Sequence, residues 1–215
     1  MQTDLYLIRH GQTATNQARL IQGWDSEPLN ARGRWQAERT GQRLAEAGLV
    51  ALYASPLRRA GETAEIIGRA SGLDVSLVDG LREMNTGRVS GLHSTQFLVR
   101  HPRLWWAWLR DDVRLAFPGG DTLSAFYDRA ARAIGALVTK HSGQTFAVVA
   151  HGGVVSGYLS LLLEGRGSNR IAMQLRNGAI SHLRWRDDAP MQVLAFNDTS
   201  HLRKQSSPDP RPSTE

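Results

Sequence analysis

A short apolar run near the start of the chain constrains the fold more than any other stretch. The residues of Leu5–Ile8 are all apolar or aromatic. The run is too short for a buried helix and shows no polar alternation, so it predicts a central strand covered on both faces. It ends at Arg9-His10-Gly11. Ligands of open α/β sheets bind beyond the carboxyl ends of the strands, so we expect these three residues to face a crevice.

The three residues at this strand end bring different chemistry. Arg9 offers planar, permanently charged donors suited to an oxyanion such as phosphate. His10 can serve as a nucleophile, a base or a metal ligand. Gly11 allows the backbone to approach a ligand closely or to adopt a positive φ.

A second strand ends in the same way. Thr145–Ala150 is the clearest buried strand of the sequence, and it is followed by His151, by glycines at 152 and 153, and by an apolar helix over 154–163. Parallel strands that end alike bring their terminal side chains to one edge of the sheet. We therefore expect His10 and His151 to share a crevice.

Further strands and helices alternate between these two runs. A strand over 50–54 leads into Ser55-Pro56, which predicts a helix N-cap followed by proline at the first helical position. Such a helix start is an anion site, because its N–H groups are unpaired. The other expected elements are a helix over 31–47 that begins at Asn30, ends before Gly48 and turns Trp35, Ala37 and Leu44 inward, an edge strand over 75–78, a helix from Asp121 to about His141, and a terminal hairpin over 179–185 and 191–197.

Four blocks of the chain resemble one enzyme family. Arg9-His10-Gly11-Gln12-Thr13 followed by Asn16 resembles the signature of the histidine phosphatase superfamily, the phosphoglycerate-mutase-like enzymes. The other blocks are Ser55-x-Leu-x-Arg59-Ala-x-x-Thr-Ala, Leu81-x-Glu83 with glycines at 87 and 91, and Ala150-His151-Gly152. The resemblance spans roughly residues 4–202. It implies an α/β fold with a mostly parallel central sheet, helices on both faces and a helical lid over the active site.

The resemblance also implies roles for individual residues. The His10 imidazole would attack a phosphoryl group and become transiently phosphorylated, and Glu83 would donate a proton to the leaving group. The spacing of the block that begins at Ser55 selects Arg59 rather than Arg58 as a phosphate ligand. The complete set of expected phosphate-binding residues is Arg9, Asn16, Gln22, Arg59, His151 and Gly152.

The family's variable lid corresponds to about residues 93–120. This stretch is rich in tryptophan, and Leu104, Trp105, Trp108 and Leu109 share one helix face, for which ordinary packing is favoured over a substrate pocket. One departure concerns the pocket: many members have an aromatic-acidic pair where this chain has Val89-Ser90. Arg82 and Arg88 favour a substrate with a second anionic group, whereas the tryptophans favour an apolar or aromatic alcohol. The substrate therefore stays open.

Composition narrows the alternatives. The chain has no cysteine, which excludes disulfides and thiolate metal sites. Its net charge of +6 comes mainly from arginines scattered over many segments, a pattern that disfavours nucleic-acid binding. The expected strand ends offer arginines instead of the carboxylates of a di-metal site, so no metal is expected.

No apolar run approaches the ~20 residues of a membrane span, and no signal peptide is evident, which makes a cytoplasmic location the default expectation.

The sequence therefore predicts one domain over 1–202, followed by a disordered tail over 203–215. The expected activity is metal-independent hydrolysis of a small phosphorylated metabolite, with no cofactor. A cofactor-dependent phosphoglycerate mutase is the first alternative, disfavoured by the short insertion between Glu83 and Gly119. A non-catalytic phospho-ligand binder is the second. The oligomeric state stays open, and a homodimer would be unsurprising.

Overall fold

The computed structural model describes residues 1–165 and 175–203, so the prediction for the tail falls outside the described residues except at Arg203. A six-stranded sheet in the order β3-β2-β4-β1-β5-β6 forms its centre. The strands are β1 (Gln2–Arg9), β2 (Ala51–Ala54), β3 (Val75–Leu77), β4 (Thr145–Ala150), β5 (Ile180–Arg186) and β6 (Ala189–Asp198). The first four in spatial order are parallel, and β5 and β6 add an antiparallel hairpin at one side. The mostly parallel sheet, the edge position of β3 and the terminal hairpin are confirmed.

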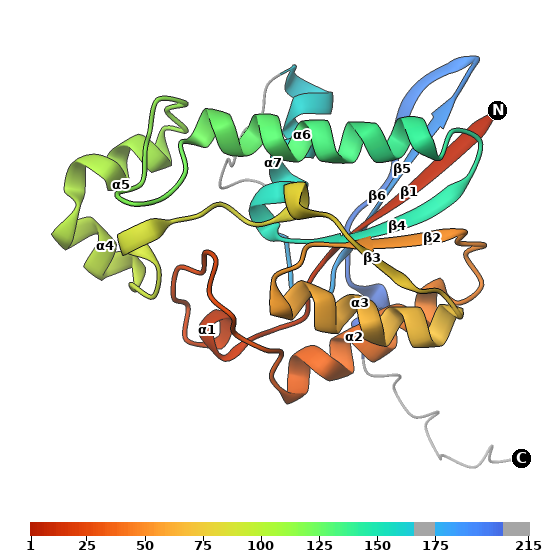
Figure 1. The fold of residues 1–215 in the computed structure, drawn as a ribbon, viewed down its shortest axis with the longest axis horizontal. Coiled ribbons are helices and arrows are strands. Elements are labelled where there is room, and N and C mark those ends of the chain that lie inside the picture. The colour runs from red at the N-terminus through yellow and green to blue at the C-terminus, as the bar shows by residue number, and fades with distance from the viewer. Residues whose placement is uncertain (166–174, 204–215) are drawn as a thin grey trace, which may run out of the picture.

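Helices cover both faces of this sheet (Figure 1). Helices α2 (Ala31–Leu44) and α3 (Arg58–Ser71) pack on one face, and α6 (Leu123–Lys140) and α7 (Gly152–Glu164) on the other. The remaining helices are α1 (Ala14–Gln17), α4 (Ser94–Arg100), α5 (Pro102–Leu109) and the 3-10 turns Asp79–Leu81, Gly87–Val89 and Ser200–Leu202. Helices α4 and α5 form the helical lid and lie together at one side of the molecule, far from the N-terminus (Figure 1). No helix in the described part of the chain is long and apolar enough to cross a membrane.

Several helix boundaries differ from the sequence-based prediction. The side chain of Asn30 caps α2 by accepting the Gly33 N–H at 2.8 Å, as expected, but the helix ends at Leu44 and leaves Trp35 36% exposed instead of turning it inward. Helix α3 begins at Arg58, not at Pro56, with Leu57 as its N-cap and no side-chain cap hydrogen bond. Helix α6 begins two residues later than predicted, with the Thr122 side chain as its cap.

A close backbone contact explains the glycine of the first motif. A Cβ at Gly11 would lie 2.4 Å from the carbonyl oxygen of Gly33, and one at Gly33 would lie 2.1 Å from that of Gln12. The turn after β1 therefore rests directly on the first turn of α2. The expectation of a positive φ at Gly11 is wrong, and the close approach that the structure shows at this glycine is that of the α2 backbone.

Candidate active site

Two buried imidazoles lie side by side at the carboxyl ends of β1 and β4. The register pairs Arg9 with Ala150, so the next residue of each strand, His10 and His151, emerges at the same level. Their ring centroids are 5.2 Å apart, and the residues are 3% and 0% exposed. The expectation that both strand ends meet at one crevice is confirmed.

The tautomer of His10 is fixed by its own backbone. Its Nδ1 donates to the carbonyl oxygen of Gly11 at 2.7 Å, because a carbonyl can only accept. Nδ1 therefore carries the proton, and the lone pair of Nε2 is free to react. Burial, together with the charges of Arg59 and Arg9, holds the pKa of His10 well below its ordinary value of 6.5, so the ring is neutral at neutral pH.

His151 is held by Ser55, from the end of β2. Its Nε2 lies 2.8 Å from Ser55 Oγ, while its Nδ1 is buried without a hydrogen-bond partner. The same Oγ accepts the N–H of Leu57 at 3.3 Å, and its hydroxyl proton can be donated to Nε2. In that arrangement Nδ1 carries a proton that is available to a ligand. Burial and the neighbouring cations also place the pKa of His151 well below 6.5.

Two arginines flank the histidines. Arg59 is 1% exposed, and its Nη2 donates to the carbonyl of Gly23 at 2.8 Å, whereas Arg58 is exposed, as the motif spacing predicted. A carboxylate oxygen of Asp25 lies 3.6 Å from Arg59 Nη1. Arg9 donates through Nη1 to the carbonyl of Leu175. Within the described chain the Nε atoms of both arginines are buried and have no hydrogen-bond partner, so each retains a donor for an anion.

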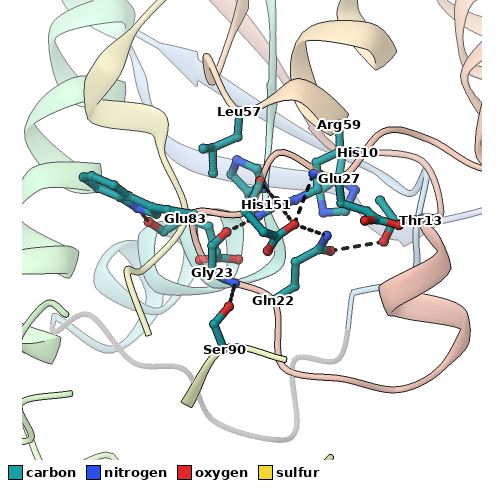
Figure 2. Close-up of polar contacts among 12 residues, drawn as sticks. His10, Thr13, Gln22, Gly23, Glu27, Leu57, Arg59, Glu83, Ser90 and His151 are labelled. Carbon is teal, nitrogen blue, oxygen red and sulfur yellow. Dashed lines mark hydrogen bonds and ion pairs between the residues drawn. The ribbon is translucent and has the colours of Figure 1, made fainter. Parts of the chain in front are cut away.

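Glu83 reaches the same cluster from the other side (Figure 2). Its carboxylate accepts the N–H of Gly153, in the first turn of α7, at 3.1 Å and the N–H of Met84 at 2.9 Å. A Cβ at Gly153 would lie 2.4 Å from its Oε1, so a larger residue there would displace the carboxylate. The indole N–H of Trp24 donates to the Glu83 carbonyl at 2.6 Å and fixes the backbone.

The neutral side chains expected at the site form a network below the histidines. Gln22 Oε1 accepts from Asn16 Nδ2 at 3.1 Å and from Thr13 Oγ1 at 3.2 Å, and its Nε2 donates to Asp25 at 2.9 Å. The structure therefore brings together Arg9, His10, Asn16, Gln22, Arg59, Glu83, His151 and Gly152, all of the predicted site residues.

Sequence reasoning missed four residues that position this set. Asn177 donates to the His10 carbonyl at 3.1 Å and to Asn16 Oδ1 at 2.9 Å, and so ties the turn after β1 to the segment before β5. The others are Trp24, Asp25 and, in its contact with His151, Ser55. Only Ser55 carried a signal in the sequence, since it begins the block that contains Arg59 and follows a predicted strand.

A pocket of about 410 Å³ opens between this cluster and the lid. Its lining is mainly apolar and includes Trp105 and Trp108 of α5, which also pack with centroids 5.5 Å from the ring of Phe97. The complete described lining is Arg19, Leu20, Ile21, Gln22, Glu83, Met84, Thr86, Ser94, Trp105, Trp108, Leu109 and Gly153. The tryptophan face therefore serves both packing and the pocket.

The charged residues of the pocket differ from those expected. Arg82 pairs with Asp79 and lies over the Trp24 ring, and Arg88 is exposed; neither lines the pocket. Arg19, which adopts a positive φ of 57°, is the arginine that does. The two arginines that suggested a second anionic group on the substrate are therefore not placed to bind one in this pocket.

The fold, the strand-end histidines and the flanking arginines define an α/β protein with a candidate phosphoryl-transfer site, and comparison with known sequences agrees. The chain belongs to the histidine phosphatase superfamily (branch 1), whose sequence profile matches residues 5–199.

Individual relatives share nearly the whole length. The chain is 33% identical over 204 residues to "Phosphoglycerate mutase-like protein 4" of Arabidopsis thaliana, covering 94% of this chain and 87% of that protein. Among solved structures, YhfR of Bacillus stearothermophilus superposes with a TM-score of 0.85 at 28% identity, over 94% of this chain and all of that one. A mutant phosphoserine phosphatase of Entamoeba histolytica, solved with phosphoserine, gives a TM-score of 0.82 at 26% identity, covering 94% of this chain and 100% of that one.

Proposed function

We propose that this chain is a metal-independent phosphatase that hydrolyses a small phosphomonoester through a phosphohistidine on His10. The observation that carries the proposal is the geometry of His10: a buried, neutral imidazole with Nδ1 engaged and Nε2 free, flanked by Arg9, Arg59 and a second imidazole. A neutral histidine among cations suits nucleophilic attack on a phosphate dianion, since the cations attract the substrate and keep the nucleophile unprotonated.

The first step forms a bond between Nε2 of His10 and phosphorus and breaks the bond from phosphorus to the alcohol oxygen. Glu83, in its acid form, gives its proton to that oxygen, so the alcohol leaves neutral. Phosphoryl transfer asks mainly for positioning and for stabilisation of charge on the three equatorial oxygens. Arg9, Arg59 and the Nδ1–H of His151 supply it, because each has an unpartnered, buried donor atom.

The second step returns the enzyme to its starting state. The Glu83 carboxylate accepts a proton from water, the water oxygen attacks phosphorus, and the bond to His10 Nε2 breaks to release phosphate. The carboxylate is held for both steps by two backbone N–H groups, those of Gly153 and Met84.

The charges at the site oppose metal catalysis. Arg9 and Arg59 lie beside the histidines and repel a cation. Among residues 1–165 and 175–203, no group of three or more His, Cys, Asp or Glu side chains is placed to hold a metal ion. The arginines supply the positive charge that a metal would otherwise provide.

The pocket supports an apolar or aromatic alcohol as the leaving group. It adjoins Glu83, the proposed proton donor, and continues to the indoles of Trp105 and Trp108. Aromatic rings bind flat apolar groups through burial and stacking.

The test is hydrolysis of p-nitrophenyl phosphate in excess EDTA by wild type and His10→Ala, each confirmed as folded by circular dichroism. We expect full wild-type activity with EDTA, loss of at least about a thousandfold in the variant, and an acid-labile phosphohistidine in quenched wild type alone. Activity that EDTA abolishes, or a variant as active as wild type, would refute the mechanism.

The mutase alternative is separated by a second assay. The curated relative is called phosphoglycerate mutase-like, and the same site groups can return the phosphoryl group to a substrate. Isomerisation of 3-phosphoglycerate faster than release of inorganic phosphate would favour a mutase over the proposed hydrolase.

A further inference from the structure

A second pocket of about 410 Å³ lies outside the substrate pocket and shares no residue with it. Four arginines line it: Arg9 at the end of β1, Arg32 in the first turn of α2, Arg176 before β5 and Arg203 after the last 3-10 turn. Trp35, the α2 side chain that does not turn inward, also lines it. The fold thus gathers four cations from four separate segments of the chain.

These charges are not neutralised within the described chain. None of the described residues that line the pocket is acidic. The ion pairs recorded for residues 1–165 and 175–203 involve none of the four arginines. Guanidinium groups that line one hollow with no carboxylate among its described lining residues repel one another, and an anion between them reduces that repulsion.

Further features of the pocket suit the same kind of ligand. Helix α2 contributes Gln36 to the lining beside Arg32 and Trp35. The side chains of Gln12 and Asn177 add neutral polar groups to the lining. The guanidinium of Arg9 donates to the carbonyl of Leu175, next to Arg176, which fixes two of the cationic segments relative to each other.

We infer that this pocket is a second anion-binding site, which takes a compact oxyanion of the phosphate class with at least two negative charges. Arginine favours such a ligand because its planar donors match phosphate oxygens in pairs. The site is distinct from the place of phosphoryl transfer, although Arg9 connects the two: a Cβ at Gly152, beside the histidines, would lie 3.6 Å from Arg9 Nε. The inference does not depend on the enzyme being a phosphatase.

The test titrates methylenediphosphonate, which cannot be hydrolysed, into the full-length protein and follows the indole N–H signals by NMR. The Trp35→Phe variant assigns the Trp35 signal. We expect that signal to shift saturably in wild type, and the apparent affinity to fall at least about tenfold in Arg32→Ala/Arg176→Ala, because two charge-assisted contacts are lost.

Arg132→Ala is the matched control, because Arg132 is an exposed arginine of α6 outside the pocket. It should bind with wild-type affinity at the same ionic strength. An unshifted Trp35 signal, equal affinity in the double variant and wild type, or an equal loss in Arg132→Ala would overturn the inference. The measurement is one of binding, so it stands whether or not p-nitrophenyl phosphate is hydrolysed.

Discussion

One hydrogen bond determines which nitrogen of His10 can react. The Gly11 carbonyl accepts from Nδ1, so the reactive lone pair is on Nε2, and burial beside Arg9 and Arg59 keeps the ring neutral. These cations thus act on the nucleophile as well as on the phosphate. Burial and the same cations lower the pKa of His151, so this ring is also neutral. When its Nε2 accepts from Ser55, the ring donates through Nδ1.

A pH titration tests this arrangement. A histidine whose pKa is lowered on folding binds fewer protons in the native state than in the unfolded chain between that lowered pKa and 6.5. We expect the ring signals of His10 and His151 in NMR spectra to stay constant from pH 8 to below 6.5. The free energy of unfolding should accordingly decrease as the pH falls below 6.5. A titration midpoint at or above 6.5 for either ring would contradict the assignment.

Adjacent arginines provide a matched pair for the phosphate-binding role. Arg59 is buried beside the histidines and Arg58 is exposed on the same turn of α3. Arg59→Lys should lower kcat/KM for p-nitrophenyl phosphate by about a hundredfold, since a lysine lacks the second planar donor. Arg58→Lys should leave it unchanged. Equal effects of the two substitutions would mean that Arg59 has no role of its own.

At the scale of elements, the contact between the turn after β1 and α2 fixes the position of the nucleophile. Gly11 and Gly33 bring two backbones together where any Cβ would overlap a carbonyl oxygen. The first turn of α2 around Gly33 is therefore the surface on which the histidine turn rests.

Gly33→Ala should destabilise the protein by about 3 kcal/mol, because its Cβ would lie 2.1 Å from the Gln12 carbonyl oxygen and one of the backbones must move. Gly61→Ala is the control: it lies within α3 with nothing within 4 Å of its Cβ, and it should raise stability by about 0.5–1 kcal/mol. Urea unfolding of both variants measures the difference. A Gly33→Ala protein as stable as wild type would show that the contact is not tight in solution.

The elements also show what a sequence can and cannot predict. β1 and β4 could be predicted because each is an unbroken apolar run, and the parallel pairing then brings His10 and His151 together. Trp24 and Asn177 could not, because they reach the site through contacts between segments 59 and 167 residues apart, which leave no local pattern. The prediction that Trp35 turns inward was wrong for a related reason. Its helix is amphipathic, but Trp35 borders the arginine-lined pocket instead of the core.

At the scale of the whole molecule, the site has two parts of different origin. In the proposed mechanism the sheet edge supplies the phosphate-binding half, from strand ends whose positions follow from the core. The half that meets the alcohol comes from α5 of the lid and from the loop around Arg19. Substrate preference can therefore change with the lid while the chemistry of the sheet edge stays the same.

Two neighbouring tryptophans of α5 test this division. Trp105 lines the pocket, while Trp106, the next residue, is 54% exposed and is not among the residues that line it. Trp105→Ala should lower kcat/KM for p-nitrophenyl phosphate about tenfold, because the aromatic alcohol loses an apolar contact surface. The inhibition constant of inorganic phosphate should not change, since in the proposed mechanism phosphate contacts only the sheet edge. Trp106→Ala should match wild type in both measurements. If Trp105→Ala weakened phosphate and p-nitrophenyl phosphate equally, the lid would be positioning the catalytic groups themselves, and the separation of the site into two parts would be wrong.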